Sequence, residues 1–442
     1  MGLLYTFVRG ALRLGLRGFF REIEVTGQEN VPMTGPLLLL ANHHNGMIDP
    51  FLLMTATDRP ITFVAKAPLF RVPVLGWILK GLRSMPAYRS EDPGHAKEKN
   101  RALFEAAMGW LSKSGAIGIF PEGRSHLDPG LVEFKHGAAR IAFDADARGI
   151  PVRVALAGIH FEHTRGFRGK VLVQFGPALG LDAYRERYAV DPRAAVMALT
   201  DELHERMSEM VLTAENHELV KLADLVEHMA VTDAGGDSDL KSTFERKKAL
   251  LEGYARLKQL VPDQMEALRR DLRNYQRFLD ALGVRDRQIA EDYRAGRVLA
   301  FAARNTAVLL LGLPFLAVAL AGNLAPYLLC QGAARLSKDL DVRTSVGFMV
   351  AFAAFPAWWA ALALLAFKAA GPWAAAGAAG LAPLTGAFAL GWMDRWNRVL
   401  QATWGLWTAL FLRAARARLR RMRARILERL EKTIDLWKGA QR

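Results

Sequence analysis

Three long uncharged stretches dominate the last third of the chain. They cover residues 306–330, 344–367 and 369–393, and none of them contains a charged side chain. Because about 20 apolar residues in a helix span the bilayer core, each stretch is long enough to cross a membrane. An alanine-rich helical core is the alternative, but the runs are too long and too uniform for ordinary buried helices. We therefore predict membrane-embedded helices over residues 298–412, with residues 399–412 as a short candidate for a fourth crossing.

Residues 22–180 carry a different pattern, made of short apolar runs. Runs of β-strand length occupy residues 37–41, 61–65, 116–120, 152–157 and 171–175. Helical patterns separate several of them, notably over residues 74–82 and 98–113. Strands that alternate with helices are typical of a mostly parallel sheet with helices on its faces. We therefore predict an α/β domain over residues 22–180, and a helical extension over the charged, helix-periodic residues 181–297.

Both ends of the chain combine apolar and basic side chains. In residues 1–21, arginines recur every four positions and the large apolar side chains fall on one broad helical face. This pattern predicts an interfacial helix on anionic lipid; an amphipathic helix that packs on its own domain is the alternative. A signal peptide is not expected, because the basic residues are spread throughout and no small-residue cleavage site follows. The tail, residues 413–442, has 11 basic and 3 acidic residues, which predicts a cytosolic location.

Composition narrows the class further. The chain has a net charge of +15, and Cys330 is its only cysteine, so neither an intrachain disulfide nor a cysteine-based metal site can form. The mixture of 51% hydrophobic and 23% charged residues excludes a disordered chain. A basic segment can bind nucleic acid or lipid headgroups. Because the basic tail follows directly on the membrane segments, we expect anionic membrane lipids as partners and no nucleic acid.

Two polar motifs follow predicted strands of the α/β domain. Residues 42–50 read Asn-His-His-Asn-Gly-Met-Ile-Asp-Pro, and residues 120–126 read Phe-Pro-Glu-Gly-Arg-Ser-His. Open α/β sheets bind ligands at the carboxyl ends of their strands. A histidine there can take a proton from an alcohol, and an aspartate bonded to its other ring nitrogen fixes the tautomer. Arginine in the second motif can bind phosphate through two hydrogen bonds. The motifs could therefore activate a substrate hydroxyl and bind phosphate; the alternatives are surface or capping residues in the first motif and a turn with solvated charges in the second.

These motifs resemble those of the glycerolipid acyltransferases, which include the glycerol-3-phosphate and 1-acyl-glycerol-3-phosphate O-acyltransferases. Residues 44–49 match the H-x-x-x-x-D block of that family, and residues 120–123 match its F-P-E-G block. Residues 66–70, Gly76 and residues 86–89 are similar to the second block, and residues 150–152 to the fourth. The family usually has Asn before the catalytic histidine, where this chain has His43. That variation is closer to the eukaryotic-type sn-1 branch, which acts on glycerol-3-phosphate or dihydroxyacetone phosphate.

The resemblance implies a role for individual residues. His44 is the expected base and Asp49 the residue that orients it, whereas His43 is expected to be structural or a supporting partner. The expected substrate-binding residues are Lys66, Arg89, Glu122, Gly123 and Arg124, and the residues expected to line the acyl pocket are Pro151 and Val152. The implied chemistry requires no metal and no cofactor other than acyl-CoA or acyl carrier protein as co-substrate.

The implied reaction moves a fatty acyl group onto the hydroxyl of glycerol-3-phosphate in phospholipid biosynthesis, and acylation of lysophosphatidic acid is the alternative. Because a long-chain product partitions into lipid, we expect an integral protein of the inner, cytoplasmic membrane with its catalytic domain facing the cytosol. Two alternatives of another class are an inactive lipid-binding scaffold and a transporter. The apolar stretches hold Lys368 between two of them and no buried charge cluster, whereas ion pathways are marked by such clusters.

Overall fold

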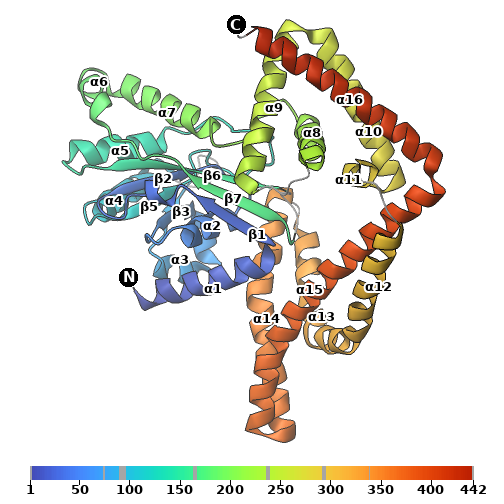
Figure 1. The fold of residues 1–442 in the computed structure, drawn as a ribbon. Helices are drawn as coiled ribbons and strands as arrows, with labels where there is room; N and C mark the ends of the chain where they lie inside the picture. Colours follow the sequence, from blue (N-terminus) through green and yellow to red (C-terminus); the bar gives the residue numbers. More distant parts are fainter. Residues whose placement is uncertain are drawn as a thin grey trace. The chain divides into compact units, whose positions relative to one another are not determined.

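The computed structural model of the 442-residue chain is shown in Figure 1. It describes residues 2–72, 75–88, 96–162, 167–234, 239–290, 295–337 and 339–440. The chain divides into two compact units. One consists of Met1–Thr213 with Ala334–Phe348, and the other of Ala214–Ala333 with Met349–Arg442. The first unit contains the β-sheet, and the second is built from helices.

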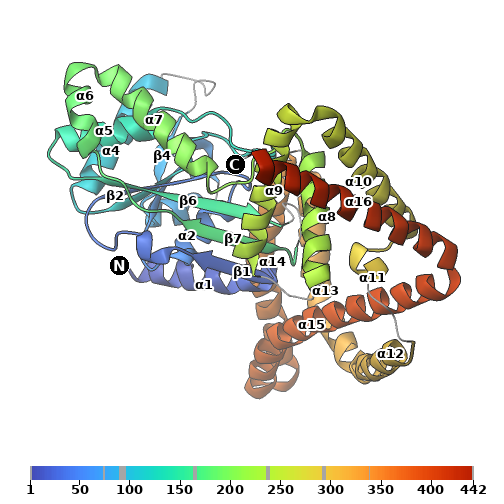
Figure 2. The ribbon, with the colours of Figure 1, turned by 45° about the horizontal axis from the view of Figure 1, so that its top comes forward.

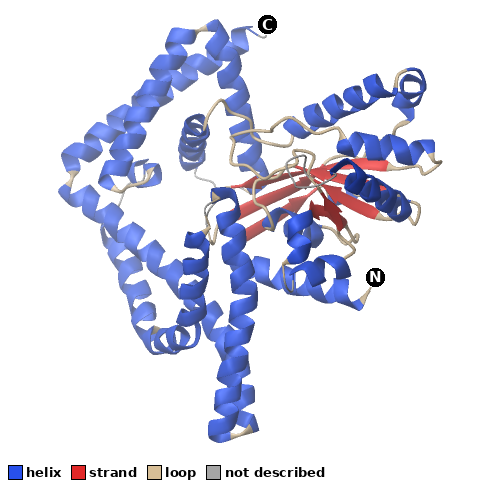
Figure 3. Ribbon diagram, turned by 180° about the vertical axis from the view of Figure 1, so that it is seen from behind, coloured by secondary structure: helices blue, strands red, loops and turns tan. Residues whose placement is uncertain are grey.

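A seven-stranded sheet lies at the centre of the first unit (Figure 3). Its strands are β1 (Glu22–Thr26), β2 (Leu37–Ala41), β3 (Thr62–Lys66), β4 (Met85–Ala87), β5 (Ala116–Ile119), β6 (Arg153–Phe161) and β7 (Lys170–Phe175). They are arranged in the order β1-β7-β6-β2-β5-β3-β4. The β6–β7 pair is antiparallel and every other neighbouring pair is parallel. The predicted α/β fold with a mostly parallel sheet is therefore confirmed.

Strand β2 occupies the middle of the sheet and is fully buried along its length. A strand that is covered on both faces reads as a continuous apolar run, because neither face meets water. Leu38 and Leu40 share a core with α4 (Ala96–Leu111), α5 (Gly137–Ala147) and α7 (Pro192–Ser208). The other side of the sheet carries α1 (Leu3–Phe19), α2 (Ile48–Ala56) and α3 (Leu75–Gly81), as Figures 1 and 2 show. The short elements are η1 (Gln28–Asn30), η2 (Ala67–Arg71), η3 (Asp182–Tyr184) and α6 (Arg185–Val190).

The first unit extends beyond residues 22–180 at both ends. Leu12 and Leu16 of α1 are buried, so one face of this helix packs on the α/β unit, whereas Leu3 and Phe7 are exposed. At the other end, α7 buries Leu199 in the same core as β2. A boundary at residue 180 would separate α7 from the surface that it covers.

The second unit contains α8 (His217–Ala234), α9 (Leu240–Leu260), α10 (Pro262–Leu282), α11 (Asp286–Ala290), α12 (Ala295–Leu311), α13 (Leu313–Leu336), α14 (Leu340–Ala370), α15 (Pro372–Phe411) and α16 (Arg413–Ala440). Helix α13 ends, and α14 begins, in residues that belong to the first unit. Helix α16 packs along α10 (Figure 2).

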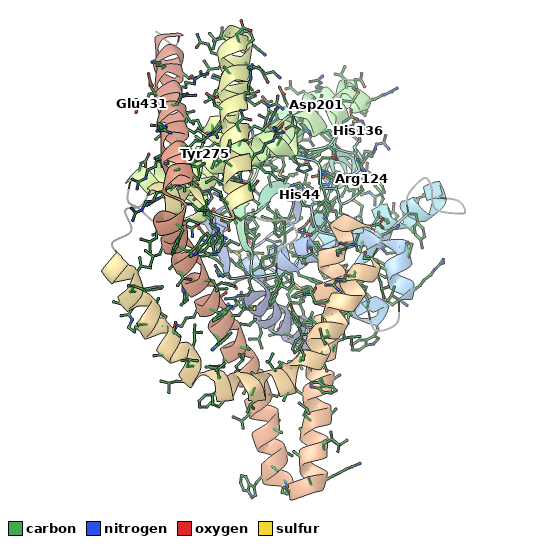
Figure 4. The ribbon with its side chains drawn as sticks, turned by 90° about the vertical axis from the view of Figure 1, so that its right-hand side faces the viewer. His44, Arg124, His136, Asp201, Tyr275 and Glu431 are labelled. Carbon is green, nitrogen blue, oxygen red and sulfur yellow. The ribbon has the colours of Figure 1, made fainter. Side chains whose placement is uncertain are left out.

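The basic C-terminal segment is a packed helix. Ile426 of α16 is fully buried, and Arg423 forms ion pairs with Asp286 at 3.0 Å and Asp233 at 2.8 Å. The hydroxyl of Tyr275, labelled in Figure 4, donates a hydrogen bond to Asp286 at 2.7 Å. Burial, with the nearby Asp286 charge, raises the pKa of Tyr275 above its ordinary value. Arg423, one of the basic residues of this segment, is therefore paired with carboxylates of the protein and is not available to bind lipid headgroups.

Within the described residues, three helical segments are long and apolar enough to cross a membrane: Leu313–Leu336, Val342–Ala370 and Pro372–Phe411. They contain most of the three uncharged stretches. Residues 399–411, considered for a fourth crossing, are the end of the single helix α15. Inside the unit, the indole of Trp359 donates to the Asn323 side chain at 3.0 Å, and Asn323 donates to the carbonyl of Ala382 at 3.3 Å. These bonds join α13, α14 and α15.

Candidate active site

Two loops meet at the carboxyl edge of the sheet. Strands β2 and β5 are parallel neighbours, so the residues that follow Ala41 and those that follow Ile119 lie at the same edge. The backbone N–H of His126 donates to the carbonyl of His43 at 3.1 Å and joins the two loops. Figure 4 labels one residue of each loop, His44 and Arg124. The two motifs that the sequence separates by more than seventy residues thus form one site.

Asp49 organises the first loop. It lies in the first turn of α2 and is fully buried. Its Oδ2 atom accepts three hydrogen bonds: from Nδ1 of His43 at 2.9 Å, and from the backbone N–H groups of His44 and Asn45, each at 2.8 Å. A carboxylate that accepts several such bonds fixes the conformation of the loop that wraps around it.

The histidine ring that pairs with Asp49 is therefore that of His43, and this corrects the expectation for His44. The bond from Asp49 to His44 uses the backbone of His44. Residues 42–47 form an irregular loop, so the spacing of four residues between His44 and Asp49 does not bring their side chains together. The side chains of His43 and His44 leave the loop in different directions, and the one directed at the carboxylate belongs to His43.

The environment of His43 suits a general base. Its Nδ1 donates to Asp49, so the neutral ring carries its proton on Nδ1 and leaves the lone pair of Nε2 available. The ring stacks on Phe120, with centroids 4.1 Å apart, and its backbone N–H donates to Oε1 of Glu122 at 3.1 Å. The side chain keeps 15% of its surface exposed. This ring is thus held on three sides and still reachable.

His44 has a different environment. Its Nδ1 lies 3.3 Å from the carbonyl oxygen of His126 and donates to it, and the two imidazole rings are 5.2 Å apart at an angle of 76°. Burial lowers the pKa of His44, and the charges of Asp49 and Glu122 oppose that effect. His44 is therefore neutral near pH 7 and has a backbone carbonyl, rather than a carboxylate, on its Nδ1.

Glu122 is buried and holds the two loops together. It was expected to position the acceptor, but only 2% of its surface is exposed. One carboxylate oxygen accepts the N–H of His43, and the other contacts Nε2 of His126. Because the N–H of Asp128 donates to Nδ1 of His126 at 3.2 Å, the proton of His126 is on Nε2 and points at Glu122. The residue His126, to which the sequence reasoning gave no role, is thus a structural partner of Glu122.

Cationic side chains border the histidines. Gly123 has a φ of +73°, a left-handed conformation that favours glycine, and it turns the chain at the end of β5. The Arg124 side chain is 62% exposed and lies 3.8 Å from Asp128. Lys135, which the sequence reasoning missed, bonds through its N–H to the carbonyl of Pro121 at 2.7 Å. A Cβ atom placed on Gly123 would lie 3.5 Å from Cγ of Lys135. The exposed side chain of Lys135 therefore lies next to the loop of Glu122, Gly123 and Arg124.

The two other predicted cations lie farther along the same edge or outside the described residues. Lys66 is exposed at the carboxyl end of β3, and β3 pairs with β5 in parallel. Its position therefore agrees with a role at this edge. Arg89 falls outside the described residues, two positions after the end of β4 at Ala87, and its role stays a prediction.

Pro151 and Val152 lie at the other end of the central strands from the two histidines, and their role in the acyl pocket stays a prediction. They precede β6, whose first residue, Arg153, pairs with Leu37 at the start of the parallel strand β2. The site follows Ala41 at the other end of that strand. At about 3.3 Å per residue, the separation along the strand is roughly 16 Å. Val152 is buried in the same core as residues of α5.

The fold and the site together define an α/β domain with a carboxylate-paired histidine next to a cationic loop. Residues 22–155 match the family model described as Acyltransferase. This part of the chain is therefore an acyltransferase family-model domain, and the resemblance drawn from the four sequence blocks is confirmed. Among the described residues, no group of three or more His, Cys, Asp or Glu side chains could hold a metal ion.

Several known proteins are similar to this chain. Glycerol-3-phosphate O-acyltransferase 2 of Saccharomyces cerevisiae is 27% identical over 198 residues, which cover 44% of the chain and 26% of that protein. The chloroplastic 1-acyl-sn-glycerol-3-phosphate acyltransferase LPAT1 of Arabidopsis thaliana is 25% identical over 139 residues, 31% of the chain and 37% of that protein. The crystal structure of the 1-acyl-sn-glycerophosphate acyltransferase of Thermotoga maritima is 21% identical, covering 46% of the chain and 80% of that structure, with a TM-score of 0.34. The chain thus spans less than half the length of these two curated relatives.

Proposed function

We propose that the protein is a membrane-bound O-acyltransferase that moves a fatty acyl group from acyl-CoA to the hydroxyl of glycerol-3-phosphate. The observation that carries this proposal is the 2.9 Å contact between Nδ1 of His43 and Asp49, located in a domain of the acyltransferase family. Acylation of 1-acyl-glycerol-3-phosphate is the second candidate, because relatives with that name match the same domain. Acyl carrier protein is the alternative donor.

In the proposed reaction, Nε2 of His43 removes the proton from the acceptor hydroxyl as its oxygen attacks the thioester carbonyl of the donor. The charge of Asp49 stabilises the imidazolium that forms. The tetrahedral intermediate then expels the thiolate of CoA, and the imidazolium returns the proton to that sulfur. The products are an ester and free CoA, and the histidine is regenerated.

The environments of the two histidines favour His43 over His44 as the base. A carboxylate in direct contact stabilises the charged ring that proton abstraction creates more strongly than a backbone carbonyl does, and Asp49 contacts the ring of His43. His44 faces a backbone carbonyl instead, and burial lowers its pKa. A buried neutral histidine next to the base limits the access of water and supports the loop.

The acceptor phosphate is proposed to bind to the cations around the loop after β5. Arg124 and Lys135 are exposed and flank Gly123, and Lys66 ends the neighbouring strand β3. Arginine can bind a phosphate with two parallel hydrogen bonds, whereas lysine acts as a point charge. Arg89 is expected to join them. A net charge of +15 also attracts phosphorylated acceptors and CoA.

We propose that α1 contacts the membrane surface, in addition to the apolar helices that enter the bilayer. Leu3, Phe7 and Leu14 are 91%, 74% and 76% exposed, and they lie on one face because their spacings approximate whole helical turns. Arg13 and Arg17 flank that face and are exposed. An exposed apolar face with flanking arginines suits an anionic bilayer surface, and the basic residues of α16 favour the cytosolic side.

The test is turnover by the purified full-length protein in detergent or vesicles. Labelled oleoyl-CoA is offered in parallel with glycerol-3-phosphate, dihydroxyacetone phosphate and 1-acyl-glycerol-3-phosphate. We expect glycerol-3-phosphate to be acylated fastest, and His43→Ala to abolish the product. Preference for 1-acyl-glycerol-3-phosphate would select the second candidate. A folded protein that acylates none of the three, from either acyl-CoA or acyl carrier protein, would refute the proposal and favour a lipid-binding scaffold.

A further inference from the structure

The beginning of helix α14 belongs to the α/β unit, although about 300 residues of sequence separate it from the catalytic loop. Residues Ala334–Phe348 form one compact unit with Met1–Thr213. The apolar segment Val342–Ala370, which is able to cross a membrane, starts within that stretch. The helix runs without a break from Leu340 to Ala370. One continuous helix therefore packs against the site at one end and enters the apolar segment at the other.

Ser345 contacts the loop that carries the two histidines. Its side chain is buried, with 1% of its surface exposed, and its Oγ accepts a hydrogen bond from the backbone N–H of Met47 at 3.0 Å. A Cβ atom on Gly46 would lie 3.9 Å from Oγ of Ser345 and from Cγ2 of Val342. The helix thus hydrogen-bonds to the loop at Met47, and a side chain on Gly46 would meet it at ordinary van der Waals distance.

Phe348, one turn farther along α14, contacts α1 and the helix α2 that follows the loop. Its side chain is buried, and its ring centroid lies 6.1 Å from that of Phe51 and 5.4 Å from that of Phe19. Phe51 is on α2, two residues after Asp49. Contacts from α14 therefore reach both the segment before Asp49 and the helix that carries Asp49.

The hydrogen bonds of the loop backbone show what Ser345 contributes. The N–H groups of His44 and Asn45 are held by Asp49, and that of His43 by Glu122. The N–H of Met47 lies between this cluster and α2, and its bond goes to α14. Without that acceptor, a mostly buried donor would have no partner, which favours another loop conformation.

We infer that Ser345 is a positioning residue, through which α14 sets the loop conformation that brings Nδ1 of His43 to Asp49. The functional part of this inference rests on the proposed acyl transfer, whereas the structural part does not. Since α14 is also a membrane-capable helix, its insertion and the geometry of the base are coupled through the contacts of Ser345 and Phe348. Ser345 touches no reacting atom in this assignment.

The kinetic test compares Ser345→Ala and Ser345→Cys with Thr344→Ala in the full-length protein. Cysteine keeps the approximate volume of serine but is a weak acceptor, so it separates the hydrogen bond from the cavity. Thr344 is in the same turn and makes no hydrogen bond to the loop among the described residues. We expect both Ser345 variants to lower kcat about 10-fold, with KM for donor and acceptor within about twofold of the unmodified protein, and Thr344→Ala to change neither. A kcat for both Ser345 variants equal to that of the unmodified protein would overturn the inference.

A second measurement is independent of activity. Hydrogen exchange of the peptide that covers residues 43–50, followed by mass spectrometry, should be about 10-fold faster in Ser345→Ala and in Ser345→Cys than in the unmodified protein. Thr344→Ala should leave it unchanged. Unchanged exchange in both Ser345 variants would reject the positioning role even if the proposed acyl transfer holds. Faster exchange in a protein that acylates no acceptor would retain the contact and reject the proposed function instead.

Discussion

Replacing Asp49 by Asn tests the site at its most connected atom. In the structure Oδ2 accepts three hydrogen bonds at 2.8–2.9 Å, and the carboxylate is fully buried. An amide oxygen can take the same place but carries no charge, which weakens each bond by about 1 kcal/mol. The gross loss of about 3 kcal/mol is partly offset, because a neutral amide costs less to bury than a carboxylate. We expect the free energy of unfolding to fall by about 1–3 kcal/mol.

The effect of Asp49→Asn on turnover should be much larger than its effect on stability. The imidazolium of His43 loses its counter-charge, and the amide also favours the wrong tautomer. In Ser-His-Asp triads, where the aspartate also orients a histidine base, the same exchange lowers kcat by about 10⁴-fold. We therefore expect kcat to fall by a factor between about 10³ and 10⁴, with little change in KM. The assay is steady-state transfer from labelled acyl-CoA, with thermal unfolding measured on the same preparation.

Asp58→Asn is the matched control for this experiment. Asp58 is also a carboxylate, 81% exposed, and pairs with Arg9 of α1 at 2.5 Å. The same chemical change at this surface site should leave kcat unchanged and cost at most about 1 kcal/mol. If Asp49→Asn retained more than a tenth of the kcat of the unmodified protein while remaining folded, a carboxylate-paired base would not be the source of catalysis.

Four further outcomes are expected. His43→Ala should abolish turnover, whereas His44→Ala should retain a measurable fraction; the reverse order would return the role of base to His44. Arg124→Ala should raise KM for the phosphorylated acceptor severalfold more than KM for acyl-CoA, and equal increases would argue against phosphate binding there. Because burial lowers the pKa of His44, the unfolded chain binds a proton near pH 6.5 that the folded chain does not. Stability should therefore decline as pH falls below about 6.5, and His44→Asn should flatten that decline in thermal unfolding. Arg423→Ala leaves two carboxylates without their partner and should cost about 3–5 kcal/mol of stability, whereas the exposed Arg421→Ala should be nearly neutral.

The sheet and the location of the site were accessible from the sequence. The apolar run of β2 and the polar residues that follow it gave the strand and the edge at which a ligand binds, because a strand buried on both faces must end in a loop. The match of residues 22–155 to the acyltransferase family agrees with this reading. Local patterns carry this information because each strand and its loop are contiguous in the chain.

Which side chains pair with each other inside the site could not be predicted from the sequence in this way. The H-x-x-x-x-D block points to His44, but residues 42–47 are irregular, so the ring of His43 rather than that of His44 meets Asp49. The burial of Glu122 depends on His126, whose orientation no sequence pattern fixes. The role of Val152 stays a prediction, because a block in the sequence does not reveal at which end of a strand it lies. The contact between Ser345 and Met47 joins residues 298 positions apart, which no local periodicity can encode.

The length of α15 has a geometric consequence. Its 40 residues rise about 60 Å as a helix, roughly twice the thickness of a bilayer core. Its apolar portion before Asp394 already accounts for about 33 Å. A membrane that holds this portion leaves some 27 Å of the helix standing in the aqueous phase. The length of this remaining part of α15 then sets how far from the headgroups the carboxyl end of α15 and the start of α16 can lie.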